Sequence, residues 1–227
     1  MSAPKPKILP LGESAVVVEF GKVISRELNC RAICLAKHLT ANPFPGFIES
    51  VPAYASTTIF YNVVKIRQAF QDGESAFETV SEILRSALDE IRIDDKGDHA
   101  TIEIPTIFDQ QSGPDLQFVS ETCGLSSEEV IELFTSPTYR VFMVGFLPGF
   151  AYMGEIDERL SMPRRSQPRS AVPKGSVGIA GRQTGIYSLE SPGGWQLIGK
   201  TEVELFTPLN EPPTFFQAGD IVRFVAI

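Results

Sequence analysis

The spacing of glycine and proline between residues 145 and 201 is the sequence feature that most constrains the fold of this chain. The segment holds ten of the eighteen glycines and the only tryptophan, Trp195. Its apolar residues fall into short pieces between turn signals, a pattern typical of a β-barrel or sandwich. One short helix is predicted before it, because Ser126 and Glu129 form a capping box. The strands expected in this half of the chain are residues 139–147, 177–179, 185–188, 195–198, 203–206 and 221–225.

The first half of the chain has a different pattern, in which strands and helices alternate. A helix capped by Ser25 should end at Asn42-Pro43, and a second should open at Asp72-Gly73. The order β-α-β-β-α-β is that of the ferredoxin-like split βαβ unit. Residues 94–98 are the best linker, so the sequence predicts an α+β domain at 1–97 and a β-barrel domain at 98–227. The strands expected here are residues 15–20, 47–51, 57–63 and 101–104, the last of which fits either domain.

Charge and cysteine content restrict the functional classes. The net charge is −8, whereas a general nucleic-acid binder needs a broad basic face. No apolar run approaches the roughly 20 residues of a membrane span, and the N-terminus lacks the apolar segment of a secretory signal. Cys30, Cys34 and His38 recur at helical spacing, but small buried cysteines explain this better than a metal site. We therefore expect a cytoplasmic protein with no resident metal and no nucleic-acid or membrane partner.

A cationic segment lies within the glycine-rich region. Six lysine and arginine side chains occur between residues 159 and 182, and no aspartate or glutamate follows until Glu190. Two prolines stiffen the backbone beside Arg164, Arg165 and Arg169, which favours a preorganised site for a carboxylate or a phosphate. A solvated basic loop on a turn-rich β-domain is the alternative.

Glycine recurs every three residues in the strand that follows the cationic segment. Close approach of the backbone to a ligand or to another strand would explain these glycines, and tight packing at barrel corners explains them equally well. Residues 194–201 match the P-loop pattern GxxxxGK[ST], but the strand-like residues within and after the match indicate chance. The residues that would accompany a bound anion here are Lys174, Gly175, Ser176, Gln183, Thr184 and Tyr187.

Groups for acid–base catalysis are hard to find in the same region. It has no histidine and no cysteine, and the nearby carboxylates Glu155, Asp157 and Glu158 have the pattern of a solvated loop. General acid–base catalysis needs a titrating group within hydrogen-bond reach of the substrate. The sequence therefore predicts a half-site whose reacting groups come partly from another polypeptide, and it leaves the catalytic residues unassigned.

A set of motifs extends over nearly the whole chain. GESAVVVEFG lies near the start and SGPDL at 112–116; GFLPGFAYMG, VPKGSVGIAG, QTGIY and SPGGWQLIGKT follow. Together they closely resemble the B subunit of prokaryotic 5-oxoprolinase, a family also labelled allophanate hydrolase subunit 1 and KipI-type kinase inhibitor. The resemblance implies a small N-terminal α+β domain followed by a cyclophilin-like β-barrel domain.

The resemblance also implies a function and partners. The chain would pair with the C subunit of 5-oxoprolinase, whose fold is related, and act with the A subunit, which is a LamB/YcsF-type protein. The assembled complex would use ATP and Mg²⁺ to open 5-oxo-L-proline to L-glutamate, with the B and C subunits activating the lactam by phosphorylation. The residues that would bind ligand or form a pocket wall or interface are Phe146, Pro148, Gly149, Phe150, Arg164, Arg165, Arg169, Pro173, Gly175, Ser176, Gln183, Thr184, Tyr187, Pro192, Gly193, Gly194 and Trp195.

The chain departs from the family pattern in places. Phe134 stands where a histidine is common, which removes a side chain able to carry a proton or bind a ligand, and Lys200 replaces a common arginine. Residues 106–108 also replace the usual tyrosine and glycine. Two other functions fit the same resemblance: a subunit for amide hydrolysis in the allophanate and urea pathway, and a regulatory protein that inhibits a histidine kinase.

Overall fold

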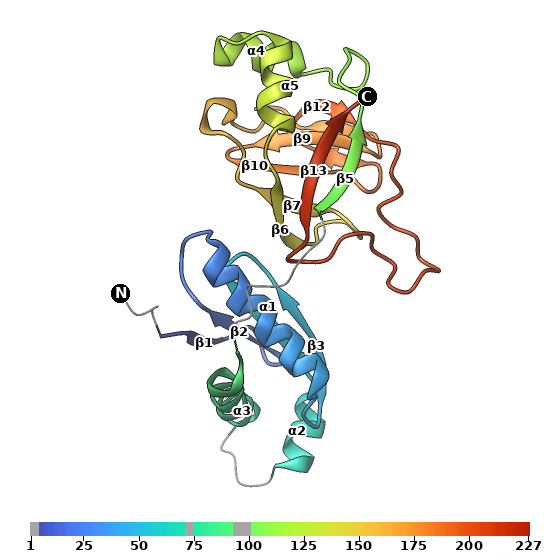
Figure 1. Ribbon diagram of the computed structural model, residues 1–227. Helices are drawn as coiled ribbons and strands as arrows, with labels where there is room; N and C mark the ends of the chain where they lie inside the picture. Colours follow the sequence, from blue (N-terminus) through green and yellow to red (C-terminus); the bar gives the residue numbers. More distant parts are fainter. Residues whose placement is uncertain (1–4, 71–74, 93–100) are drawn as a thin grey trace. The chain divides into compact units, whose positions relative to one another are not determined.

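The structure, a computed structural model, describes residues 5–70, 75–92 and 101–227. The chain divides into two compact units, Met1–Gly97 and Asp98–Ile227 (Figure 1). The predicted combination of helices and strands is confirmed, whereas the ferredoxin-like and cyclophilin-like assignments stay predictions. The predicted linker at 94–98 and the expected helix start at Asp72-Gly73 lie outside the described residues.

The first unit contains an antiparallel four-stranded sheet in the order β1-β2-β4-β3. β2 and β3 flank β4, which gives a split βαβ arrangement around α1. The strand expected at 101–104 belongs to the sheet of the second unit, and β1 lies beside β2 instead, with Lys7 opposite Glu19. The elements are β1 (Lys7–Pro10), β2 (Ala15–Glu19), α1 (Arg26–Ala41), β3 (Phe47–Pro52), β4 (Ser56–Tyr61), α2 (Val63–Ala69) and α3 (Ala76–Glu90).

Side chains cap α1, α2 and α3 at their starts. Ser25, Asn62 and Ser75 each accept a hydrogen bond from the backbone N–H three residues further on. The sequence did not predict α2, because seven residues are too few for a clear helical period. Leu35 of α1 and Leu84 of α3 are fully buried in one core with the sheet. Within the described ranges, no helix has the length and apolarity that a membrane crossing requires.

The second unit contains a seven-stranded sheet in the order β12-β9-β10-β7-β6-β13-β5. Its edges meet where Ile107, just after β5, exchanges two backbone hydrogen bonds of 2.8 and 2.9 Å with Lys200 of β12. This contact nearly closes the sheet into a barrel. The elements are β5 (Thr101–Thr106), α4 (Leu116–Cys123), α5 (Ser127–Thr135), β6 (Tyr139–Val144), β7 (Ala151–Gly154), η1 (Glu158–Leu160), β8 (Arg169–Val172), β9 (Ser176–Ala180), β10 (Gln183–Ile186), β11 (Ser191–Gly193), β12 (Gln196–Lys200) and β13 (Ile221–Ala226).

One parallel pair stands out in this sheet. β13 lies between β6 and β5 and runs parallel to β5, with Ile221 opposite Thr101 and Ala226 opposite Thr106. Figure 1 shows the two strands side by side, β13 in red and β5 in green. The sheet therefore joins a segment from the start of the second unit to one from its end.

Side chains fill the inside of the barrel-like sheet. Val177 and Ile186 point inward from β9 and β10, and Phe134 of α5 belongs to the same core. The ring of Phe134 is fully buried, with centroid distances of 4.7 Å to Phe224 and 5.4 Å to Tyr139. The position at which the resemblance implies a histidine is therefore a packed core position in this chain.

Several elements of the second unit differ from the prediction. Strands β7, β8 and β11 were not expected from the sequence. The strand expected at 203–206 is reduced to an isolated bridge between Phe206 and Thr214. Helix α4 is additional, and it ends at Gly124, whose φ of 68° lies in the left-handed region that favours glycine. Short pieces of this kind lack the periodicity from which the other elements were predicted.

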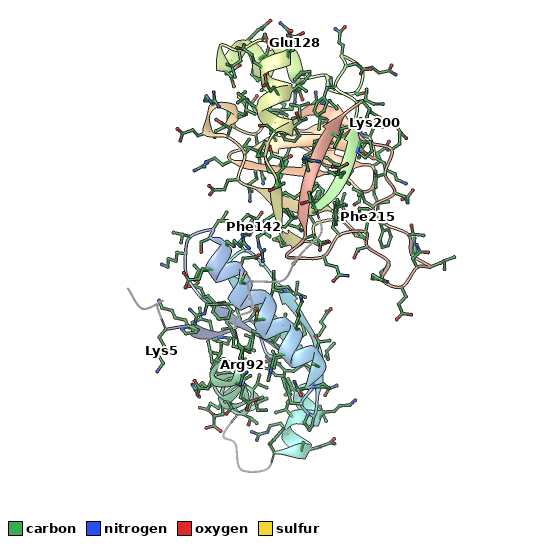
Figure 2. The ribbon with its side chains drawn as sticks, viewed as in Figure 1. Lys5, Arg92, Glu128, Phe142, Lys200 and Phe215 are labelled. Carbon is green, nitrogen blue, oxygen red and sulfur yellow. The ribbon has the colours of Figure 1, made fainter. Side chains whose placement is uncertain are left out.

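The P-loop match at 194–201 coincides with strand β12 rather than with a loop before a helix. Residues 201–220 contain no helix whose N-terminus could face a phosphate. Lys200, labelled in Figure 2, places its Nζ 2.9 Å from a carboxylate oxygen of Glu202. The match is therefore chance, as the sequence indicated.

Candidate functional site

An aromatic cluster covers the outer face of strands β7, β9, β10 and β12. Residues along these strands alternate between the two faces, as Met153 and Ile179 lie in the barrel core and their neighbours Tyr152 and Ala180 in this cluster. We call this set the outer cluster. Its members are Leu147, Phe150, Tyr152, Val172, Ala180, Tyr187, Trp195 and Leu197.

Two glycines let aromatic side chains lie directly on the sheet. A Cβ added to Gly185 would lie 2.9 Å from Cζ of Phe150, and one added to Gly178 would lie 3.1 Å from Cβ of Trp195. The rings of Phe150 and Trp195 meet edge to face, with centroids 5.6 Å apart. At these two positions the close approach is made by the chain's own atoms, which supports tight packing as the reason for the glycines.

Phe146 extends the outer cluster to the surface. Its side chain is 62% exposed, and its ring meets that of Phe150 edge to face at 5.7 Å. Its φ of 70° is unusual for a residue with a Cβ and persists only where neighbouring contacts hold it. One such contact is the 3.0 Å hydrogen bond from the Gly145 N–H to the Phe150 carbonyl. A strained, exposed aromatic residue beside a buried aromatic cluster is typical of a recognition surface.

The positive charge of Arg164 affects the pKa of two tyrosine hydroxyl groups in the outer cluster. Burial raises the pKa of the Tyr187 and Tyr152 phenols, and the positive charge of Arg164 partly offsets that rise. Arg164 itself is exposed and has no carboxylate at ion-pair distance among the residues that the structure describes. Its guanidinium is therefore available to an anion.

Arg165 and Arg169 converge on one buried carboxylate. Asp115 Oδ1 accepts hydrogen bonds from Arg165 Nη1 at 2.9 Å and Arg169 Nη2 at 2.8 Å, and Oδ2 accepts from the Leu197 N–H at 2.7 Å. The Asp115 side chain is 5% exposed. Although Asp115 precedes α4, its carboxylate makes no capping hydrogen bond to that helix, because these partners occupy it. Two guanidinium groups against one carboxylate leave a positive charge in excess.

Three buried polar atoms of this region have no hydrogen-bond partner within the described part of the chain. They are Arg165 Nε, Arg169 Nη1 and Gln196 Oε1. Buried polar groups are nearly always paired in folded proteins, because an unpaired one costs free energy. The two unpaired arginine donors therefore suit a bound anion, in agreement with the excess positive charge.

Hydrogen bonds tie the arginine-bearing loop to the loop that precedes β12. The Arg165 N–H donates to the Gly194 carbonyl at 2.7 Å, and Gln196 Nε2 donates to the Pro163 carbonyl at 3.1 Å. β8, which begins at Arg169, and β11, which ends at Gly193, pair as a two-stranded antiparallel sheet. The backbone that carries the arginines is thus fixed to the segment that carries Trp195.

Three residues with a predicted binding role have partners of their own or lie apart. Lys174 Nζ contacts both carboxylate oxygens of Glu204, at 2.7 and 2.5 Å. Thr184 Oγ1 donates to a backbone carbonyl inside the sheet at 3.0 Å. Gln183 begins β10, at the opposite end of that strand from Tyr187. The structure therefore does not gather these side chains with the three arginines.

Two of the predicted glycines, Gly175 and Gly193, serve close packing. A Cβ on Gly175 would lie 2.1 Å from the Thr201 carbonyl oxygen, and one on Gly193 would lie 2.3 Å from Tyr187 Oη. Ser176 is buried at the start of β9. The remaining predicted residues lie in loops or in the short strand β11: Pro148, Gly149, Pro173, Pro192 and Gly194.

Sequence reasoning missed Asp115, Tyr152 and Gln196. Asp115 belongs to the SGPDL motif, but nothing local indicates that it meets arginines 50 and 54 residues later. Tyr152 had a usable signal, because it alternates with the inward-facing residues of β7. Gln196 had none, since its environment is set by the Pro163 loop.

The chemistry of these groups suits anion binding better than catalysis. In the described ranges, no group of three histidine, cysteine, aspartate or glutamate side chains could hold a metal ion. The titratable members of the outer cluster are two tyrosines, whose raised pKa keeps them protonated near neutral pH. The arrangement can hold an anion, but it supplies no proton acceptor of the kind that general base catalysis needs.

Comparison with known proteins defines the class. The family model for the carboxyltransferase domain, subdomain C and D, matches residues 6–216. The curated 5-oxoprolinase B subunit of Bacillus subtilis (strain 168) is 44% identical over 222 residues, which are 97% of this chain and 92% of that protein. The chain therefore belongs to the family of 5-oxoprolinase B subunits.

Longer proteins contain a similar region. The crystal structure of TTHA0988 matches 94% of this chain with a TM-score of 0.81 and 36% identity, and the chain spans 40% of the length of that protein. Urea amidolyase of Saccharomyces cerevisiae is 25% identical over 225 residues, which are 88% of this chain and 12% of that protein. Relatives of this chain thus occur both as separate proteins and as parts of larger ones.

Proposed function

We propose that this chain is the B subunit of an ATP-dependent 5-oxoprolinase that opens 5-oxo-L-proline to L-glutamate, and that it is inactive alone. The observation that carries the proposal is the outer cluster with its three arginines, which binds but lacks a base among the described residues. The name of the 44% identical relative supports it. In this proposal the first unit is a ferredoxin-like domain, the second is a cyclophilin-like barrel, and the protein works in the cytoplasm.

The arginines hold the anionic groups of the reaction. Arg164 is exposed without an ion-pair partner in the described chain, and Arg165 Nε and Arg169 Nη1 are unpaired donors. Planar guanidinium donors fit the carboxylate of 5-oxo-L-proline or a phosphate of ATP. Mg²⁺ accompanies ATP and neutralises phosphate charge in phosphoryl transfer. We expect the ion to be held through ATP in the assembled complex.

The C and A subunits of the complex supply the missing reacting groups. The exposed ring of Phe146, held in a strained conformation on the outer cluster, offers an anchor on which the C subunit packs. The Bacillus relative is named as one subunit of an enzyme, and this name supports the proposal that this chain works with partner subunits. TTHA0988 and yeast urea amidolyase, in which a region like this chain is part of a longer polypeptide, support work in contact with other domains.

Reconstitution from purified subunits is the direct test. The chain is mixed with the C and A subunits, Mg-ATP and 5-oxo-L-proline, and L-glutamate and ADP are measured together. We expect glutamate only when all three subunits are present. If folded proteins form neither glutamate nor substrate-dependent ADP, the proposal is wrong.

Arg164→Ala tests the role of the arginines in the same assay. A hydrogen bond to a charged group contributes about 1.5–3 kcal/mol, so we expect kcat/KM to fall about 10- to 150-fold. Arg159→Ala is the matched control, because it removes an exposed arginine of the same unit that pairs with Asp157 at 2.7 Å. Equal activity of the two variants would remove Arg164 from the site.

Amide hydrolysis in the urea pathway is the second candidate. The yeast relative named urea amidolyase favours it. Allophanate replaces 5-oxo-L-proline in the reconstitution, with all other components unchanged. Turnover of allophanate without turnover of 5-oxo-L-proline would establish this candidate in place of the first.

A further inference from the structure

The first unit contains a cationic pocket that the proposed function does not use. Its volume is about 430 Å³, and its walls come from α1, α3 and the residues at the start of β1. Lys5, Arg31 and Arg85 line it together with one acidic side chain, Asp89. The pocket therefore carries two positive charges in excess, in a chain whose net charge is −8. Figure 2 labels Lys5 just before β1.

Arg31 distinguishes this pocket from a solvated basic patch. Its guanidinium carbon lies 5.0 Å from the ring centroid of Phe20, which is 1% exposed, and this cation–π contact holds the side chain against the core. Arg31 Nη1 is buried and has no hydrogen-bond partner in the described ranges. A buried charged donor without a partner costs stability. An anion bound in the pocket would supply that partner.

The residues of α3 that line the pocket add exposed charges. Arg85 and Asp89 lie one turn apart on α3, a spacing at which ion pairs commonly form, yet they make no ion pair there. Both side chains are exposed, so both are available to a ligand. Ile8 and Leu88 add apolar surface. The pocket has the size of the sites that bind small organic molecules.

We propose that this pocket binds a small organic dianion, a phosphate ester or a dicarboxylate. Arg31, whose Nη1 is buried, is the anchor, and Arg85 and Lys5 bind the second negative charge. The site is built from the first unit alone, so it does not depend on the function proposed for the outer cluster.

Calorimetric titration of the full chain at low salt tests the proposal, with inorganic phosphate and glutarate as separate probes. We expect at least one probe to bind with a dissociation constant of about 1 mM or tighter. Binding of phosphate assigns the phosphate ester, and binding of glutarate assigns the dicarboxylate. Arg31→Gln and Arg85→Gln should each weaken binding at least about tenfold. Lys37→Gln is the matched control, because Lys37 is an exposed cation of α1 that does not line the pocket.

Further outcomes separate this pocket from the arginines of the second unit. Amide NMR shifts on titration should appear in α1, α3 and β1, and Arg164→Ala should leave these shifts unchanged. Shifts confined to the second unit and lost in Arg164→Ala would assign the anion to the outer cluster and overturn the proposal. The proposal would also be overturned if neither phosphate nor glutarate bound. Equal binding by Arg85→Gln and Lys37→Gln would overturn it as well. Because Arg85 is exposed, its variant tests the pocket without endangering the core.

Discussion

Replacing Asp115 by alanine tests how firmly the arginine-bearing loop is held. The change leaves Arg165, Arg169 and the Leu197 N–H without their common acceptor. Removing one partner of a buried ion pair costs about 3–5 kcal/mol. The two arginine side chains are 35% and 23% exposed, so water replaces part of the lost interaction. We therefore expect the second unit to lose about 3 kcal/mol of unfolding free energy, at the lower end of that range.

Trp195 provides the assay for this prediction. It is the only tryptophan of the chain and is 5% exposed, so its fluorescence during urea unfolding reports on the second unit. Asp115→Asn keeps one acceptor and should cost about 1–2 kcal/mol. Glu204→Ala is the control, because its ion pair with Lys174 is exposed and should contribute less than about 1 kcal/mol.

The unfolding free energy lost in Asp115→Ala tests whether the buried carboxylate holds the two arginines. If Asp115→Ala cost no more than Glu204→Ala, the buried carboxylate would not be what holds the two arginines. A double-mutant cycle with Arg169→Ala separates the direct contribution, since residues in one ion-pair network do not add independently. Additive effects in that cycle would refute the coupling that the 2.8 Å contact indicates.

Two further predictions concern the second unit. Gly193→Ala should lower the free energy of unfolding by about 1–3 kcal/mol in the same fluorescence assay, because its Cβ would lie 2.3 Å from Tyr187 Oη. Gly194→Ala is the control and should change little, because its Cβ would lie 3.7 Å from the nearest neighbouring atom. Equal effects of the two variants would contradict the packing argument. Hydrogen bonds from Arg159 lower the pKa of Asp157 to about 2, so this contact stabilises the fold above the ordinary pKa of 3.8 and is lost as the pH falls to about 2. An NMR titration of the carboxyl carbon measures that pKa, which should rise in Arg159→Ala and would stay low if another group caused the shift.

The barrel was predictable because its signal is local. Glycine and proline between residues 145 and 201 cut the apolar residues into strand-sized pieces, and this holds whatever the strands pair with. The pairing itself was not predictable. The contact of Ile107 with Lys200 and the place of β13 between β5 and β6 join residues far apart in the sequence. Periodicity within one segment carries no information about such contacts.

The site was predictable only as a set of cations and aromatic residues. The absence of acids near Arg165 and Arg169 in sequence suggested that both were free for a ligand, yet Asp115 reaches them from another part of the chain. Lys174 likewise pairs with Glu204. Arg164 fits the expectation best, because it is exposed without an ion-pair partner in the described residues. The sequence shows the charge and size of each side chain, whereas the partners of a charged side chain depend on how the backbone folds.

The parallel pair of β5 and β13 has a consequence for protein synthesis. Glu103 of β5 and Arg223 of β13 are 120 residues apart, so at roughly 5–20 residues per second a ribosome needs roughly 6–24 s to reach one strand after the other. Throughout that interval β5 displays Ile102 and Ile104 without the neighbour that pairs with it in the finished sheet. A nascent chain that stalls after β12 should therefore bind chaperones more readily than the completed chain, because β5 does not yet have β13 to pair with.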